Sequence, residues 1–557
     1  MLKELKERLG EALQRAIREA TAAGGLRHAE LPEVAWEYPE EPAFGDLSTT
    51  AAFLLAKALK KRPRELAQAL LRHLKFDPTL VERVEVAGAG YLNFFLAKAF
   101  WQGVVKEVLE QGEAYGRAQI GRERRVQVEF VSANPTGPLH VGHGRGAALG
   151  DALANLLEAV GFQVEREYYI NDAGTQMELL GRSVFARYLE CFGREAPFPE
   201  GGYRGDYIRD LASAIALKEG AGYLEWPESE VVRLFARKTS TEILAWIRRD
   251  LERFGVRFDR WFSEKSLYET GEVDRAVELL KEKGYIYEEE GAIWFKSTLF
   301  GDDKDRVLIR GTGEPTYYAS DVAYHMEKFR RGYEVIVDIW GHDHHGYAPR
   351  VQAAVQALGH PSEALQIILV QLVSLLRGGR PVAMSTRAGE FVTLREVMEE
   401  VGKDAARFIF LTRRADSPLD FDLEVAKAQS MENPVYYVQY AHARLTSVLR
   451  EAEKVGLHPP YLDADLSQLD LPEELSLIKR LALYPELIAG AASAFEPHRI
   501  TAYLQELAAQ LHSYYNKHRI ISPDRVLSRA RLALAASIRT VLHNALAILG
   551  VSAPERM

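Results

Sequence analysis

Two histidines and a glycine stand close together where a strand-like run of residues meets a helix-like run. Residues 125–131 alternate in character and favour a strand, and residues 147–157 have helical spacing; His140, Gly142 and His143 lie between them. The N-terminus of a helix offers unpaired N–H groups and a partial positive charge, and the imidazoles add further donors. Gly142 lets a flat ring approach the backbone. This stretch therefore predicts a site that favours an anion, and the alternative is a glycine-rich capped turn with two surface histidines.

The same order of strand, Gly/His loop and helix recurs later in the chain. Residues 334–340 favour a buried strand that ends in the loop Gly-His-Asp-His-His-Gly at residues 341–346. Asn171-Asp172-Ala173-Gly174 follows another predicted strand, residues 163–170, at the carboxyl end where open α/β sheets hold their ligands. The pattern predicts two halves of one nucleotide-binding sheet, separated by a mostly helical insertion at about residues 177–290.

The histidine-rich loop raises the alternative of a metal site. His342, Asp343, His344 and His345 are all metal-ligand types, but adjacent residues on one loop cannot all face one ion, and no well-spaced partner is evident. A polar rim of a substrate pocket is the preferred interpretation, and we expect no tightly bound metal.

The segments on either side of the predicted sheet indicate two further domains. With 557 residues the chain exceeds what one core can organise. Residues 1–118 alternate helices and strands, residues 119–432 contain the sheet, and residues 433–557 have only helical patterns. The predicted fold class is multidomain α/β. A Rossmann-like core with a helical insertion lies between a small α+β domain and an all-α domain.

Composition limits the class and the compartment. The net charge of −9 gives no overall affinity for nucleic acid, so any nucleic-acid surface must be a local patch. A single cysteine, Cys191, excludes an internal disulfide framework and a cysteine-rich zinc site, and it fits a reducing compartment. The acidic first helix is unlike a signal or transit peptide, and no apolar run could span a bilayer. We expect a cytoplasmic protein without membrane contact.

Two local patches have side chains that suit unpaired bases. In the amino-terminal domain, Tyr91 and Asn93 follow a flexible turn, where a ring could stack on a base and an amide could bond to it. In the carboxyl-terminal domain, Tyr514, Asn516 and Arg519 lie in a stretch rich in aromatic and basic residues. The alternatives are core tyrosines and a solvated helical bundle.

Together these motifs resemble those of class I aminoacyl-tRNA synthetases. His140-Val141-Gly142-His143 resembles the HIGH signature, and Met384-Ser385-Thr386-Arg387 resembles KMSKS in part. Nearly the whole chain is similar to arginyl-tRNA synthetases of the bacterial type. The segments that carry this narrower resemblance are Glu129 and Asn134 beside residues 133–140, Asn171 to Gly174, Tyr317 with Asp321, Tyr440 to Arg444, and residues 549–557.

The second signature departs from the family pattern. Ala383 and Thr386 stand where the family has lysines, which leaves Met384, Ser385 and Arg387. This loop must place a cation over the pyrophosphate. Arg387 is the candidate because a guanidinium binds phosphate through several donors, although another basic side chain could substitute.

The resemblance implies three sets of site residues and their ligands. ATP, with Mg²⁺ carried on its phosphates, would contact His140, Gly142, His143, Met384, Ser385 and Arg387, of which His140, His143 and Arg387 would be catalytic. L-arginine would contact Glu129, Asn134, His140, Tyr317, Asp321 and His342. The tRNA(Arg) elbow would contact Tyr91 and Asn93, and its anticodon Tyr514, Asn516 and Arg519.

The chemistry of Tyr317 and Asp321 agrees with a guanidinium ligand. Four residues apart on a predicted helix, they share one face and supply an aromatic wall and a carboxylate. Lysine or an uncharged isostere would leave buried charge unpaired, so no editing domain is needed.

The implied reaction is formation of arginyl-adenylate, followed by transfer to the terminal ribose of tRNA. By the same resemblance, a monomer and tRNA-dependent activation are expected. Three alternatives remain: a class I synthetase for another amino acid, a small nucleotidyltransferase, and a non-catalytic tRNA-binding paralogue, which the altered second signature favours.

Overall fold

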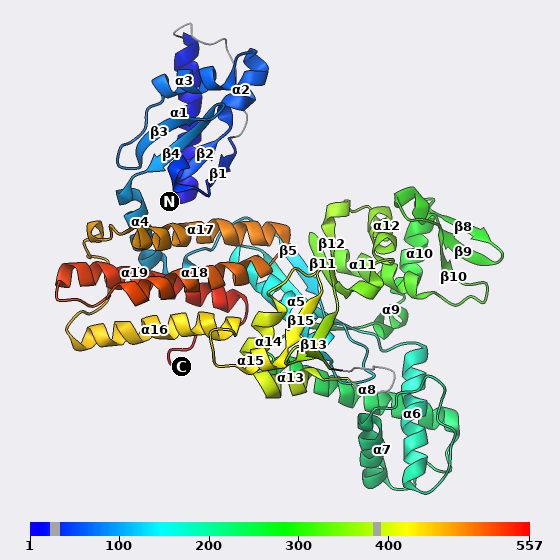
Figure 1. The fold of residues 1–557 in the computed structure, drawn as a ribbon. Coiled ribbons are helices and arrows are strands. Elements are labelled where there is room, and N and C mark those ends of the chain that lie inside the picture. The colour runs from blue at the N-terminus through cyan, green and yellow to red at the C-terminus, as the bar shows by residue number, and fades with distance from the viewer. Residues whose placement is uncertain (23–33, 383–390) are drawn as a thin grey trace.

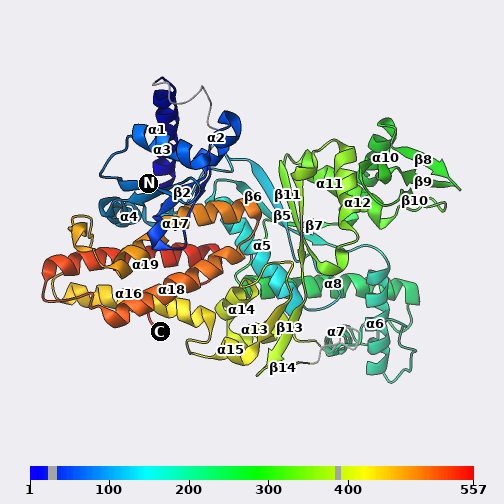
Figure 2. The ribbon, with the colours of Figure 1, turned by 45° about the horizontal axis from the view of Figure 1, so that its top comes forward.

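The computed structural model describes residues 1–22, 34–382 and 391–557. The predicted positions Met384, Ser385 and Arg387 lie outside the described residues. Figures 1 and 2 show an amino-terminal domain, a helical bundle, a central sheet and two lobes beyond it.

Five parallel strands form the central sheet and confirm a Rossmann-like core. The spatial order is β12-β11-β5-β6-β7, so the direction in which successive strands are added reverses between β5 and β11. Ligands bind at such a switch point, outside the carboxyl ends of the strands. The strands are β5 (Arg125–Glu129), β6 (Gln163–Ile170), β7 (Arg260–Ser263), β11 (Val335–Gly341) and β12 (Leu365–Val370).

Two helices cover opposite faces of β5. Phe130, just beyond β5, packs so closely on α5 (Val141–Ala159) that a Cβ on Gly150 would lie 2.1 Å from the Phe130 ring. Glu129 points the other way and contacts α11 (Tyr317–Arg330). Because side chains alternate along a strand, β5 is apolar toward α5 and polar toward α11.

The predicted insertion at residues 177–290 is not one unit. Three packed helices, α6 (Thr175–Cys191), α7 (Asp206–Glu219) and α8 (Glu228–Arg253), form a first lobe. The chain then returns to the central sheet as β7, which pairs with β6 in parallel. Four residues are too few to show a strand period, which explains why the sequence pattern missed β7.

A second lobe follows β7, includes α11 and is completed by α12, which comes after β11 in the chain. It contains an antiparallel sheet of order β10-β9-β8, and α12 packs against α11. Its further elements are α9 (Lys265–Glu269), α10 (Glu272–Glu282), β8 (Ile286–Glu289), β9 (Ala292–Phe295), β10 (Arg306–Ile309) and α12 (Ala348–Leu358).

After β12 a small sheet and three helices close the core. Strand β13 pairs with β14 in an antiparallel and with β15 in a parallel arrangement. The elements are β13 (Val373–Arg377), β14 (Arg380–Pro381), α13 (Leu394–Val401), α14 (Lys403–Phe410), β15 (Leu419–Asp422) and α15 (Leu423–Lys427).

The amino-terminal domain is α+β, as predicted, around a four-stranded antiparallel sheet of order β1-β2-β4-β3. Leu47–Thr49 forms strand β2. The elements are α1 (Leu2–Ala22), β1 (Trp36–Glu37), β2, α2 (Ala51–Leu59), α3 (Pro63–His73), β3 (Val81–Ala87) and β4 (Tyr91–Leu96).

The carboxyl-terminal helices form a bundle that includes α4 (Lys98–Gln111) from the first part of the chain (Figure 1). The Gln102 amide donates to the Leu469 carbonyl (3.1 Å), and the Asn544 amide to the Gly112 carbonyl (3.0 Å). The packing therefore ends the amino-terminal domain before α4 rather than at residue 118. The later helices are α16 (Pro434–Lys454), α17 (Pro472–Ala494), which runs unbroken through Pro485, α18 (His498–Lys517) and α19 (Arg525–Ile548).

A buried guanidinium joins the bundle to the core. Arg407, on α14, is fully buried and pairs with Asp151 on α5. It also donates to the Phe254 carbonyl (3.2 Å) and, at the end of α19, to the Leu549 carbonyl (3.1 Å). One side chain thus fixes α5 against the last helix of the chain.

We predict that Arg407→Met destabilises the protein by about 3–5 kcal/mol, because its loss leaves the buried Asp151 carboxylate with only the more distant Arg166, 3.7 Å away, and leaves the Phe254 and Leu549 carbonyls without this donor. Thermal unfolding measures the effect. Arg414→Met, which removes an exposed cation paired with Asp416, is the control and should leave the midpoint nearly unchanged. Equal midpoints for the two variants would contradict the role of Arg407.

Candidate active site

The two predicted histidines form the first turn of α5. His140 is the N-cap, and its Nδ1 accepts from the backbone N–H of Gly142 (3.1 Å) and of His143 (3.4 Å). In return, His143 Nδ1 accepts from the His140 backbone N–H (3.2 Å), and the rings stack with centroids 3.7 Å apart.

Burial lowers the pKa of His140, and it lowers the pKa of His143 well below its usual value. Both rings are therefore neutral near pH 7. Since each Nδ1 accepts, each Nε2 carries the proton. The helix start presents two uncharged donors suited to an anion.

A strained turn connects β5 to this histidine loop. Val131 and Ser132 both have left-handed backbones, with φ of 68° and 40°, a conformation that is costly for a β-branched residue. The turn brings the Ser132 hydroxyl back, where it donates to Glu129 Oε1 (3.0 Å) and accepts from the Tyr169 backbone N–H (3.1 Å). The strain is thus coupled to the orientation of Glu129.

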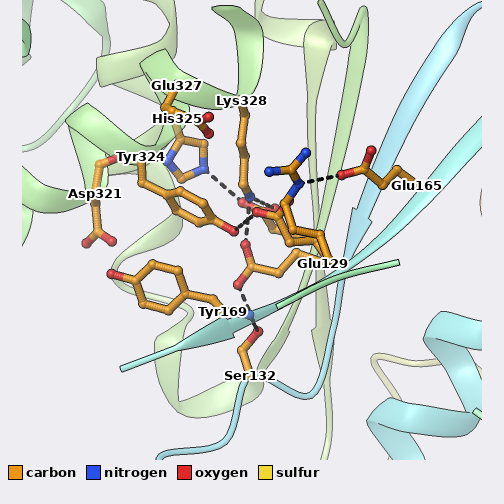
Figure 3. A network of polar contacts seen from close by, with 12 residues as sticks. Glu129, Ser132, Glu165, Tyr169, Asp321, Tyr324, His325, Glu327 and Lys328 are labelled. Carbon is orange, nitrogen blue, oxygen red and sulfur yellow. Dashed lines mark hydrogen bonds and ion pairs between the residues drawn. The ribbon is translucent and has the colours of Figure 1, made fainter. Parts of the chain in front are cut away.

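Two buried carboxyl groups, Asp321 and Glu264, have perturbed pKa values in this part of the structure. Burial raises the pKa of Asp321 to about 6, against the effect of a hydrogen bond from the Tyr347 hydroxyl. Burial and the Asp321 charge raise the pKa of Glu264 to about 7. Among the ion pairs of the described residues, none joins a cation to Asp321 or Glu264, so burial is not offset by an opposite charge. In Figure 3 the Asp321 carboxyl and the Tyr169 hydroxyl point into the same space.

The remaining residues predicted for the arginine site differ in their exposure and in their contacts. Tyr317 is one turn before Asp321 on α11 and 53% exposed. The Asn134 amide donates to Gln176 (2.7 Å), and His342 stacks on His345 with centroids 5.3 Å apart. Among the hydrogen bonds of the described residues, none joins Asn134 or His342 to the acids.

Sequence reasoning missed Glu264, Tyr347 and Lys328. Glu264 follows β7, the strand that the pattern did not reveal, and Tyr347 directly precedes α12. Lys328 did leave a signal, because Asp321, His325 and Lys328 form a polar stripe at helical spacing on a largely buried helix.

The predicted tRNA contacts differ in their exposure. Tyr91 is 39% exposed beside Phe53, and Asn516 and Arg519 are exposed. Asn93 is buried, and its Oδ1 accepts from the Ser48 hydroxyl (2.8 Å), so only the rest of its amide is left for a base.

Tyr514 contradicts the prediction that it contacts the anticodon. Its ring is 2% exposed and its hydroxyl donates to Glu474 (2.9 Å). It continues the apolar face of α18, so it is a core tyrosine.

Within the described ranges, no three His, Cys, Asp or Glu side chains are grouped to hold a metal ion. None of the described helices is both long and apolar enough to span a membrane.

Family models match three consecutive parts of the chain. The model "Arginyl tRNA synthetase N terminal domain" matches residues 3–96, "tRNA synthetases class I (R), catalytic domain" matches residues 104–446, and "DALR anticodon binding domain" matches residues 438–557. The chain belongs to the arginyl-tRNA synthetase family. The family boundary at residue 96 agrees with the packing of α4 on the bundle.

Relatives support this membership over the full length. The arginine–tRNA ligase of Syntrophotalea carbinolica is 55% identical, over 100% of both chains, and that of Geobacter sp. (strain M21) is 53% identical, over 99% of this chain and 100% of its own. The structure of Thermus thermophilus arginyl-tRNA synthetase is similar with a TM-score of 0.74 and 26% identity, covering 99% of this chain and 100% of that one.

We predict that a guanidinium ligand binds more tightly as the pH rises from 5.5 to 8. The raised pKa values of Asp321 (about 6) and Glu264 (about 7) mean that both groups must lose protons to face a cation. The affinity for L-arginine should fall by about tenfold or more toward pH 5.5, since one pKa unit corresponds to about 1.4 kcal/mol. Calorimetric titration tests this. Asp321→Asn should bind more weakly and with less pH dependence, whereas a flat profile for the unaltered protein would exclude the pair from the site.

Proposed function

We propose that this protein ligates L-arginine to tRNA(Arg) in two steps. The first step forms arginyl-adenylate and pyrophosphate from arginine and ATP, and the second transfers arginine to the 3′-terminal ribose of the tRNA. Membership of the arginyl-tRNA synthetase family supports the reaction. The observation that carries the choice of amino acid is the carboxyl of Asp321, held by the Tyr347 hydroxyl one turn from the exposed Tyr317 ring, with the buried Glu264 nearby and no ion pair to either acid among the described residues. A guanidinium would pair with these acids.

The arginine side chain would lie between these carboxylates, with the Tyr317 ring as a wall. Its α-ammonium group would bind Glu129, with Asn134 and His342 at the edge of the site. Lysine has one compact ammonium in place of a planar fork and cannot pair with both carboxylates in the same way. The site therefore selects arginine because a wrong amino acid would leave a buried carboxylate without a partner.

The histidine loop would hold the ATP phosphates. Neutral Nε2–H groups of His140 and His143 donate at the N-terminus of α5, and Gly142 leaves room for the adenine. A carboxylate oxygen of arginine attacks the α-phosphorus in line, the bond to the bridging oxygen breaks, and pyrophosphate leaves. The protein positions the reactants and stabilises the developing charge.

Mg²⁺ would arrive with ATP and neutralise its phosphates. Arg387, Met384 and Ser385 remain predicted phosphate contacts. Phe391 lies 6.1 Å from the His140 ring, between ring centroids, and the Val141 N–H donates to the Val392 carbonyl (3.2 Å). The chain just after the second signature therefore runs beside the histidine loop, which is the first signature.

The tRNA would bind at both ends of the chain. Tyr91 suits its elbow, and Asn516 with Arg519 suits the anticodon. Action in the cytoplasm and as a monomer remain part of this proposal. The altered second signature favours the alternative of a non-catalytic tRNA-binding paralogue.

The test is exchange of labelled pyrophosphate into ATP, measured with each amino acid in turn, with and without a tRNA pool. We expect exchange with arginine alone and only when tRNA is present. Retained tRNA binding without exchange for any amino acid would favour the non-catalytic paralogue.

We predict that His140→Ala and His140→Asn both slow exchange by about 100-fold or more, the usual cost of losing one donor to a transition state. Asparagine keeps an N-cap acceptor for α5, so His140→Asn should unfold near the unaltered protein's temperature. Near-normal exchange by a folded His140→Asn would remove this imidazole from the chemistry.

A further inference from the structure

Three carboxylates lie side by side across the central sheet. Asp338 on β11 is in register with Glu129 on β5, which is in register with Glu167 on β6. Adjacent strands are about 4.8 Å apart, and all three side chains are buried. Like charges in this arrangement repel one another, so the row requires cations.

The face of α11 that covers the row supplies them (Figure 3). Lys328 is fully buried, and its Nζ lies 2.6 Å from Glu129 Oε2 and 2.8 Å from Asp338 Oδ1. Arg331, at the end of the helix, pairs with Glu167. Lys328 is thus the cation that contacts Glu129, and it shares its charge with Asp338.

The other groups around Glu129 do not replace this cation. From β6, Glu167 is an acid paired with Arg331, and Tyr169 has a pKa raised by burial and stays neutral. From β11, Asp338 is anionic. From α11, Tyr324 donates to Glu167 (2.6 Å), His325 contacts Asp338 (2.9 Å), and Asp321 is a further carboxyl. Burial raises the pKa of Glu129, and the Lys328 charge is the main effect that opposes the rise.

The two oxygens of Glu129 have separate partners. Oε2 contacts Lys328, and Oε1 accepts from Ser132 on the strained turn. Fixed at both oxygens, the carboxylate cannot rotate, and Oε1 has a lone pair left for a ligand.

We propose that Lys328 is a positioning residue for amino-acid recognition: it keeps Glu129 ionised and oriented so that Glu129 binds the α-ammonium group of arginine. This inference rests on the proposed function. Lys328 itself does not contact the substrate. Its loss would weaken the α-ammonium contact and leave the guanidinium contacts of Asp321 and Glu264 in place.

The test compares L-arginine with desamino-arginine, which has hydrogen in place of the α-amino group. Both ligands use the guanidinium subsite, so the ratio of their dissociation constants isolates the α-ammonium contact. In Lys328→Met, we expect L-arginine to lose about tenfold or more of its affinity at pH 7.0, which corresponds to at least one pKa unit at Glu129, while desamino-arginine binds as before. The L-arginine affinity should recover toward pH 8.5 as Glu129 ionises again.

The matched control is Arg330→Met, on the same helix, which removes a cation paired with Glu272 away from the site. Its ratio should equal that of the unaltered protein. Equal weakening of both ligands in Lys328→Met, or an unchanged ratio, would overturn the proposal, because Lys328 would then only hold α11 in place.

If Lys328→Met does not fold, the double variant with Asp338→Asn removes one charge of each sign and keeps the buried charge balanced. In this double variant L-arginine should also lose affinity relative to desamino-arginine, but by a smaller factor. An unchanged ratio of the two dissociation constants would overturn the proposal. If the unaltered protein bound neither ligand, the arginine site itself would be wrong and this role with it.

Discussion

A buried carboxylate needs a cation, and the site depends on how this requirement is divided between the protein and its ligand. The protein supplies Lys328 and Arg331 to the acids inside the sheet. Among the described residues, no cation forms an ion pair with Asp321 or Glu264, and burial raises the pKa of both groups. The acids inside the sheet are thus paired with cations of the protein, while the acids of the pocket suit the planar, multiply donating guanidinium of a ligand.

The sheet makes this division possible because its two faces differ. Toward α5, β5 packs closely, and Gly150 has no room for a Cβ beside Phe130. Toward α11, it carries the acids. Close packing fixes the start of α5, where His140 and His143 lie, and ion pairs fix α11, where Tyr317 and Asp321 lie. Two kinds of interaction therefore position the nucleotide half and the amino-acid half of one site.

The parts predicted from sequence are those that local pattern encodes. The histidine loop joins a strand to a helix within a few residues, and Tyr317 and Asp321 are one helical turn apart. The contacts of Glu129 with Lys328, 199 residues away, depend on strand register that no local pattern contains. Strand β7 was too short to recognise, so Glu264 was missed. Tyr514 was misassigned because the aromatic and basic composition of the surrounding segment suggested a base contact. Its spacing from Leu507 and Leu511 places it on a buried face of the helix.

Helix α4 belongs to a bundle whose other helices come from the last quarter of the chain. Its apolar side chains, among them Phe100, Trp101 and Val105, are buried in the finished protein. During synthesis at about 5–20 residues per second, α4 leaves the ribosome long before α17 and α19 exist to cover it. For tens of seconds the nascent chain therefore carries an apolar helix whose partners in the bundle have not yet been made. The native bundle closes only when the carboxyl terminus has been made.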